Sequence, residues 1–339
     1  MADQRRAGDA GRFGWLGSDM IQDERWIHRF SQEELDELDR ALGVFNATGK
    51  SVEEMTREDF PLSLFASKAV GHVAELRDGR GFVVLRGLPV AGYSDADSGA
   101  IFYGLGLYLG RPLYQNPQGD LLGHVYDRGR KFGAKDVRGS LTNAYLPFHT
   151  DSCEIVGLLC LRAAKSGGAS SLCSSVAVFR EIADKHPEYL EPLRRGYPYI
   201  LREAAATNSA ITTPPVPVYD SIDGVVSCRF IPTQIEAAAQ VAGRPLAGLE
   251  RAAFDEVLKL SASAPFRLDM QLQQGDIQLV NNYTVLHSRT EYEDWPEAER
   301  RRHMVRLWLA FDDAWPLQQG FARPLGYRKG AGVDLGIAA

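Results

Sequence analysis

A histidine and an aspartate stand two residues apart in the stretch LPFHTDSCEIVGLLCL, at His149 and Asp151, directly before a long apolar run. In an extended strand, residues i and i+2 point to the same face, so this imidazole and carboxylate could bind one ion together. A further histidine, His287, lies far along the chain in GDIQLVNNYTVLHSR. Two histidines and one carboxylate leave three positions open on an octahedral metal, which is typical of non-haem Fe(II) oxygenases. The alternatives are a solvated turn for the pair and a structural role for His287.

The stretch ERRRHMVRLWLAF combines four arginines with a strict alternation of residue types. One predicted strand face is apolar and carries Val305, Leu307, Leu309 and Phe311. The other face carries Arg302, Met304, Arg306 and Trp308. Arginine on an inward face is costly unless it meets an anion, and its planar fork pairs two carboxylate oxygens. Arg302 and Arg306 would lie about 13 Å apart along the strand, far enough to bind different anionic groups. The alternative is an exposed face whose arginines form surface salt bridges.

In this order, FHTD, KSGGASS, GDIQLVNNYTVLHSR and RRHMVRLWL resemble the motifs of the taurine dioxygenase (TauD/TfdA-like) family. The resemblance covers residues 80–315. It implies a mainly β fold with α-helices, namely a double-stranded β-helix (a jelly-roll, cupin-like core) with an N-terminal helical layer and helical insertions. It also implies Fe(II) as the metal, 2-oxoglutarate as the cosubstrate and O2 as the oxidant.

The resemblance implies a role for each matching residue. His149, Asp151 and His287 would hold the iron, and Arg302 would bind the distal carboxylate of 2-oxoglutarate. A hydroxyl after the Gly-Gly turn would share that carboxylate, which points to Ser170, with Ser171 as the adjacent rival. Arg306 matches the position that meets an acidic group on the substrate. The acidic insert EYEDWPEAE leaves the register before Arg302 open, although Arg301 would face the opposite side of the strand.

The implied reaction is oxidation of an unactivated C–H bond, coupled to decarboxylation of 2-oxoglutarate to succinate and CO2. Hydroxylation is favoured over halogenation because Asp151 is retained, while desaturation and cyclisation stay open. The expected substrate is a small amino-acid-like or carboxylate- or sulfonate-bearing metabolite, with Arg306 as its anion partner. Two other classes stay open: a non-oxygenase cupin-like metal enzyme, and a non-catalytic jelly roll with a vestigial metal site.

The helices and strands that must position these residues are predicted from the pattern of apolar, capping and turn residues along the sequence. Residues 25–110 read as mainly helical, with a capping box at Ser31 and Glu34 and a second cap at Ser94 or Asp95. From about residue 110 short β-rich runs alternate with turns, including an Asp223-Gly224 hairpin and a turn at Gly275, and two helices interrupt them near residues 176–190 and 248–263. We therefore predict a flexible tail over residues 1–15 and one catalytic domain over 16–330, with its β-core at 80–315. The proline-rich segment 202–220 could form a lid or a plain surface loop.

The composition excludes several classes of protein. The chain has 339 residues, 45% apolar and 24% charged, with a formal net charge of −6, so no nucleic-acid partner is expected. No apolar run approaches 18 residues and the N-terminus lacks a secretion signal, so no membrane partner is expected either. Four cysteines without a C-x-x-C pair predict buried free thiols in a reducing cytoplasm. A homo-oligomer stays open.

Overall fold

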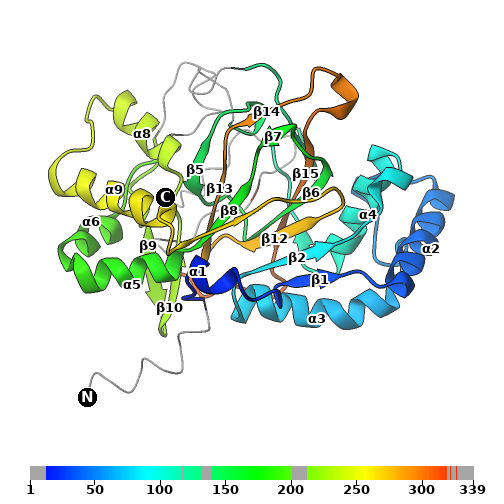
Figure 1. Ribbon diagram of the computed structural model, residues 1–339. Coiled ribbons are helices and arrows are strands. Elements are labelled where there is room, and N and C mark those ends of the chain that lie inside the picture. Colours follow the sequence, from blue (N-terminus) through cyan, green and yellow to red (C-terminus); the bar gives the residue numbers. More distant parts are fainter. Residues whose placement is uncertain are drawn as a thin grey trace.

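The computed structural model describes residues 13–116, 118–130, 139–200 and 212–318, together with Phe321 and Gly326. Two β-sheets face each other in the middle of the molecule, and a helical layer covers the outer face of each (Figure 1). This is the predicted mixed fold with a jelly-roll core. Within the described part of the chain, no helix is both long and apolar enough to cross a membrane.

The larger sheet has the strand order β1-β2-β12-β6-β15-β3, and β4 also pairs with β15. Its strands are β1 (Ile27–Arg29), β2 (Phe82–Arg86), β12 (Ile277–Asn281), β6 (Ile155–Arg162), β15 (His303–Ala310), β3 (Arg111–Pro112) and β4 (Leu122–Val125). Only β1 and β2 pair in parallel, and the other pairs in this sheet are antiparallel.

The smaller sheet has the order β11-β8-β13-β5 and is antiparallel throughout. Its strands are β11 (Arg267–Met270), β8 (Ser170–Ser174), β13 (Val285–Arg289) and β5 (Leu146–His149). Two short ribbons flank it, β9 (Tyr219–Ile222) with β10 (Val225–Cys228), and β7 (Ser166–Gly167) with β14 (Tyr292–Glu293). The first ribbon is the predicted hairpin, and its turn residues Asp223 and Gly224 both have positive φ, as this tight turn requires.

Helices α2 (Gln32–Thr48), α3 (Ser63–Asp78) and α4 (Asp95–Leu107) cover the larger sheet, after the short α1 (Gly17–Met20). The capping box at Ser31 and Glu34 begins α2 as predicted, and Ser94 caps α4. Helices α5 (Ser175–Lys185), α6 (Leu190–Arg195), α8 (Pro232–Val241) and α9 (Gly248–Ala262) cover the smaller sheet. The sequence predicted α5 and α9 but missed α8, whose Pro232 stands in the first helical turn.

Residue alternation sorts the core into three layers. On β15, Val305, Leu307 and Leu309 pack under the N-terminal helices, as predicted for that face. Met304 and Trp308 point the other way, into the layer between the two sheets. Cores of this kind position side chains rigidly because both sheets are fixed by their own hydrogen-bond ladders. The predicted iron and cosubstrate residues line this middle layer.

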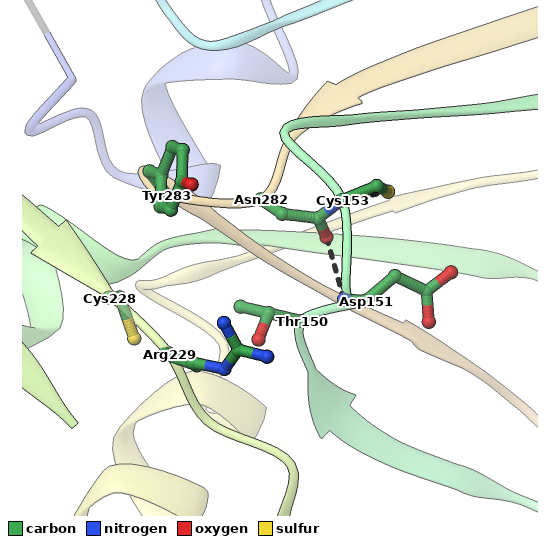
Figure 2. A pocket seen from close by; sticks show the side chains of 7 residues that line it. All are labelled: Thr150, Asp151, Cys153, Cys228, Arg229, Asn282 and Tyr283. Atoms are coloured by element: carbon green, nitrogen blue, oxygen red, sulfur yellow. Dashed lines mark hydrogen bonds between the residues drawn. The ribbon is translucent and has the colours of Figure 1, made fainter. Parts of the chain in front are cut away.

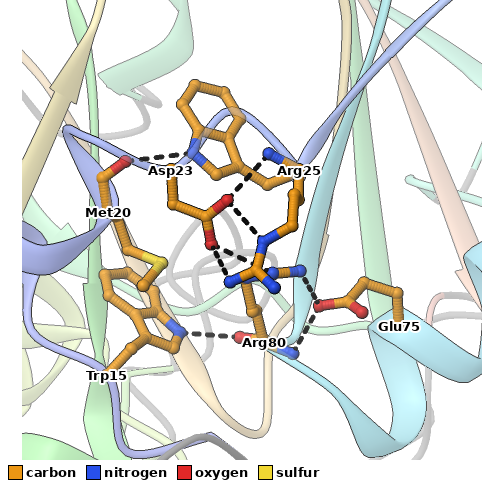
Figure 3. A network of polar contacts seen from close by, with 7 residues as sticks. Trp15, Met20, Asp23, Arg25, Glu75 and Arg80 are labelled. Carbon is orange, nitrogen blue, oxygen red and sulfur yellow. Dashed lines mark hydrogen bonds and ion pairs between the residues drawn. The ribbon is translucent and has the colours of Figure 1, made fainter.

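The N-terminal boundary differs from the predicted tail of residues 1–15. Residues 1–12 lie outside the described part of the chain, but Phe13 and Trp15 are buried. Trp15 Nε1 donates to the carbonyl oxygen of Arg80 at 2.8 Å, and Arg80 forms ion pairs with Asp23 and Glu75 (Figure 3). These two aromatic side chains anchor the segment to the sheet. The polar residues around them in the sequence had led to the prediction of a flexible tail. The proline-rich segment 202–220, expected as a lid or a surface loop, lies outside the described residues up to position 211, and its remaining residues lead into β9.

Candidate metal centre and cosubstrate pocket

Strands β5 and β13 bring the two predicted histidines together. They pair antiparallel with His287 directly opposite His149, and the two ring centroids lie 4.3 Å apart. Directly opposed residues on neighbouring strands project to the same face of the sheet, here the face between the two sheets. This register explains how two histidines that are distant in sequence come to share one site.

Asp151 completes the cluster just beyond the end of β5. One ligand atom from each of His149, Asp151 and His287 lies within 4.8 Å of the others. His149 Nδ1 is hydrogen-bonded to the carbonyl oxygen of Pro147 at 2.8 Å, which leaves Nε2 to face Asp151 Oδ1 at 4.0 Å. Bonds from nitrogen and oxygen ligands to a divalent ion are about 2.1 Å long, so the three groups can close on one ion with small side-chain rotations. The structure thus brings the whole predicted triad together.

The protonation states suit a metal ion. Burial lowers the pKa of His149, and burial followed by the neighbouring His149 lowers the pKa of His287 to about 3. Burial raises the pKa of Asp151, but Arg306 and the two imidazoles outweigh it and lower that pKa to about 2. At neutral pH the site therefore holds two neutral imidazoles and one carboxylate, the forms that bind metals.

Asp151 is oriented by a set of partners around it. Arg306 Nη1 and Trp308 Nε1 donate to its Oδ2 at 3.2 and 3.0 Å, and its backbone N–H donates to Asn282 Oδ1 at 2.9 Å. Arg306 Nε in turn donates to Gln115 Oε1 at 2.7 Å. These contacts fix Oδ2 and leave Oδ1 toward the histidines. The sequence suggested that Arg306 binds an anionic group of the substrate. In the structure, Arg306 already donates hydrogen bonds to Asp151 and Gln115.

Arg302 lies deeper between the sheets and is only 6% exposed. Its guanidinium stands 5.1 Å from the centroid of the Tyr292 ring, and its Nη1 has no hydrogen-bond partner among the residues that the structure describes. A Cβ on Gly168 would come within 3.2 Å of Arg302 Nε, so the glycine of the predicted Gly-Gly turn gives the guanidinium room. Burial lowers the pKa of Arg302.

A second buried arginine, Arg289, lies beside Arg302, and the two guanidiniums around the Tyr292 ring form the candidate cosubstrate pocket. Arg289 follows His287 by two residues on β13 and therefore points to the same face. Its guanidinium lies 4.9 Å from the centroid of Tyr292 and donates to the carbonyl oxygens of Thr142 and Ala144. Its Nε and Nη1 are buried and have no partner within the described ranges of the chain. Burial, and then Arg302, lower its pKa to about 10. The sequence signal for Arg289 was the i, i+2 spacing from His287, the same spacing that revealed His149 and Asp151.

Ser170 and its rival Ser171 are separated by the strand period. Ser170 is buried, pairs in register with Arg289, and donates to Gln278 Oε1 at 3.0 Å. Ser171 points to the other face and donates to Asp269 Oδ1 at 2.6 Å. Between the two, Ser170 is the hydroxyl on the same face of the sheet as Arg289.

These residues fit 2-oxoglutarate by a simple test. The pocket holds two guanidiniums and the Tyr292 hydroxyl, and all three have buried polar atoms without partners in the described part of the protein. Unpaired buried cations are costly, and a dicarboxylate would satisfy them. The three ligand side chains nearby suit Fe(II). Sequence reasoning missed the supporting residue Gln115, because an isolated amide is common in any loop.

Comparisons with known proteins agree with this geometry. The family model described as "Taurine catabolism dioxygenase TauD, TfdA family" matches residues 46–308. The chain is similar to FR-33289 synthase of Streptomyces rubellomurinus, with 28% identity over 88% of this chain and 89% of that protein. It is also similar to a uridine-5'-phosphate dioxygenase of Amycolatopsis sp, with 32% identity over 45% of this chain and 54% of that protein.

Solved structures share the fold. An asparagine oxygenase in complex with Fe(II), 2S,3S-3-hydroxyasparagine and succinate superposes with a TM-score of 0.67 at 18% identity, over 84% of this chain and 94% of that one. The non-haem iron oxygenase OrfP in complex with Fe, succinate and (3S)-hydroxy-L-Arg superposes with a TM-score of 0.61 at 12% identity, over the same shares.

The jelly-roll core with its two-histidine, one-carboxylate cluster defines a non-haem Fe(II)- and 2-oxoglutarate-dependent oxygenase. Within that class, the chain belongs to the TauD/TfdA dioxygenase family. This membership removes the non-oxygenase cupin enzyme from the alternatives.

Proposed function

We propose that this oxygenase hydroxylates a C–H bond of a small anionic or amino-acid-like metabolite, with His149, Asp151 and His287 holding Fe(II). The observation that carries the proposal is the cluster of three ligand atoms within 4.8 Å, adjoining two buried arginines with N–H groups that no described residue satisfies. A metal site alone would suit many enzymes, whereas a metal site beside a cationic pocket suits a metal with an acidic cosubstrate.

Each residue has a separate task in this proposal. Arg302 and Ser170 bind the distal carboxylate of 2-oxoglutarate, and Arg289 adds a second cation to the same pocket. Arg306 and Trp308 orient Asp151, a positioning role supported by their hydrogen bonds to Oδ2. The apolar layer between the sheets excludes water from the reacting groups. When bound, Fe(II), 2-oxoglutarate and O2 supply the oxidation itself, which converts the cosubstrate to succinate and CO2.

The substrate class is supported by the names of the similar proteins. A uridine-5'-phosphate dioxygenase acts on a phosphate-bearing compound, and the two solved oxygenases are complexed with hydroxylated amino acids. Hydroxylation is the reaction we propose, with desaturation or cyclisation as the second candidate, since all three begin at the same C–H bond. We also propose a cytoplasmic location, supported by four free buried cysteines. A homo-oligomer stays open, and sedimentation of the purified protein is its test.

One titration tests the proposed function. Under argon, Fe(II) and then 2-oxoglutarate are added to the protein, and the metal-to-ligand charge-transfer absorption is recorded. We expect the band to form in the natural protein and to disappear in His149→Ala. Candidate acids and amino acids are then screened in air for coupled succinate release. Absence of the band in the natural protein, with iron shown to be bound, would contradict the proposal.

A further inference from the structure

The segment after β10 runs directly beside the metal ligands. Cys228 N–H donates to the carbonyl oxygen of Tyr283 at 2.7 Å, and Thr150 N–H donates to the carbonyl oxygen of Phe230 at 2.8 Å. Phe230 N–H returns a bond to Thr150 Oγ1 at 3.2 Å. Arg229 lies between these anchored residues, so its backbone is held next to the residue that precedes Asp151.

The Arg229 guanidinium lines a small cavity at this point. The cavity is lined by Thr150, Asp151, Cys153, Cys228, Arg229, Asn282 and Tyr283 (Figure 2). Figure 2 shows the guanidinium turned toward Thr150, while the carboxylate of Asp151 extends away from it. The cavity therefore adjoins the metal centre through Asp151 but has its own positive end.

No described residue neutralises this charge. Arg229 is partly buried, and its guanidinium forms no ion pair or side-chain hydrogen bond with the described part of the protein. Asp151, the acidic residue among the lining set, is held by Arg306 and Trp308 instead. Burial lowers the pKa of Arg229, and the described side chains that oppose this effect are two tyrosines and a cysteine.

The other polar groups of the cavity are already occupied. Thr150 Oγ1 exchanges bonds with the backbone of Phe230. Asn282 Oδ1 accepts from the Asp151 N–H, and Asn282 Nδ2 contacts Cys153 Sγ at 3.1 Å. Of the described lining residues, Arg229 thus offers the charged donors that remain free. A cation left unpaired beside an active site is costly to the fold unless a ligand compensates it.

We infer that Arg229, and not Arg306, anchors the anionic group of the substrate. The group is an oxyanion, either a carboxylate or a phosphate, because the planar fork of arginine pairs two oxygens of either one. The inference rests on the proposed function for the presence of a substrate to be oxidised. It assigns the two arginines different tasks: Arg306 orients a metal ligand, whereas Arg229 sets the distance between the substrate's anionic end and the iron.

The test measures anion binding to the protein loaded with Fe(II) and saturating 2-oxoglutarate under argon, by calorimetry with sodium acetate and with inorganic phosphate. Saturating cosubstrate keeps both probes out of the Arg302 pocket. We expect Arg229→Gln to raise the Kd of the anion by about 10- to 100-fold, because a hydrogen bond to a charged group is lost. Arg229→Lys should retain part of the affinity. Tighter binding of acetate would identify a carboxylate substrate, and tighter binding of phosphate a phosphorylated one.

The matched control is Arg244→Gln, which removes an arginine whose side chain is 71% exposed and paired with Glu250. It should leave anion binding unchanged. Three results would overturn the inference. The natural protein binds neither anion, Arg229→Gln binds the anions as tightly as the natural protein does, or Arg306→Gln loses anion binding while Arg229→Gln keeps it. If Arg229→Gln fails to fold, the Arg229 Nε resonance of ¹⁵N-arginine-labelled natural protein decides, since it must shift on addition of the anion.

The charge-transfer band is recorded in the same samples. A normal band in Arg229→Gln with weakened anion binding supports the inference. A normal band with unchanged anion binding refutes it and leaves the oxygenase assignment intact. Absence of the band in the natural protein refutes the proposed function itself, so the two failures are distinguishable.

Discussion

The buried guanidinium of Arg302 should make the protein less stable in the absence of 2-oxoglutarate than a neutral variant would be. It is 6% exposed, no described residue pairs with its Nη1, and Arg289 adds a second cation to the pocket. An unpaired buried charge costs several kcal/mol, and the Tyr292 ring at 5.1 Å returns only about 1–2 kcal/mol of it. Arg302→Met keeps most of the bulk and removes the charge. We expect it to raise the free energy of unfolding by about 1–3 kcal/mol when no cosubstrate is present.

The same substitution should damage cosubstrate binding. Removing one member of a buried charge pair costs about 2–5 kcal/mol, which raises the Kd for 2-oxoglutarate by about 30- to 5,000-fold. Saturating 2-oxoglutarate stabilises the natural protein by mass action, so the ranking of the two proteins should reverse when it is added. A gain in stability together with a loss of binding is the signature of a charge kept for its ligand.

The assay is urea unfolding of the Fe(II)-loaded proteins under argon, with and without 2-oxoglutarate, combined with titration of the charge-transfer band. Arg301→Met is the control, because Arg301 is exposed and donates to the carbonyl oxygens of Trp295 and Pro296 instead of facing the pocket. It should change neither the Kd nor the ranking. If Arg302→Met is less stable without cosubstrate and binds it with natural affinity, Arg302 is a structural residue and the reasoning fails.

Three further predictions concern the ligands, their support and a remote histidine. Asp151→Ala should lower metal affinity by at least about 100-fold in competition with a chromophoric chelator and abolish succinate release, and full turnover would remove Asp151 from the metal site. Arg306→Gln should lower metal affinity by about 10- to 100-fold through the lost bond to Asp151 Oδ2, and an unchanged affinity would contradict its positioning role. Burial, and then His28, lower the pKa of His72 to about 4. The unfolded chain, with a histidine pKa near 6.5, then takes up more protons, so stability falls as the pH drops from about 6.5 to 4. His72→Phe should recover up to about 3 kcal/mol of this loss in urea unfolding at pH 4, and identical acid profiles would exclude His72 as a source.

The two-residue alternation of side chains along each strand made part of the site predictable from the sequence. The alternation on β15 correctly separated Leu307 from Arg306, because side chains on a strand change face at every residue. The same rule placed His149 and Asp151 together and distinguished Ser170 from Ser171. Caps and turns were equally local, as at Ser31 and the Asp223-Gly224 hairpin.

Hydrogen bonds and ion pairs between residues far apart in the sequence could not be predicted. Nothing in the sequence around Arg306 reveals that Gln115 and Asp151 would occupy its donors, since both come from other segments of the chain. The lack of a described partner for the Arg229 guanidinium was equally hidden, because it depends on how distant segments pack around that side chain. Charge type can be read from a residue, but the pairing of that charge is a property of the packed fold.

The arginines of the site differ in whether an acidic partner within the protein neutralises them, and this difference explains which ligands the site would select. Arg306 has its carboxylate within the protein and stays paired before any ligand binds. Arg302 and Arg289 have buried donors that no described residue satisfies, and the pKa of Arg289 is lowered partly by Arg302, so the two cations repel each other. A dianionic cosubstrate would relieve that repulsion and its burial cost together, whereas a neutral analogue could relieve neither. Selectivity for an acid at this pocket therefore follows from the energy of the empty fold as well as from the contacts in the complex.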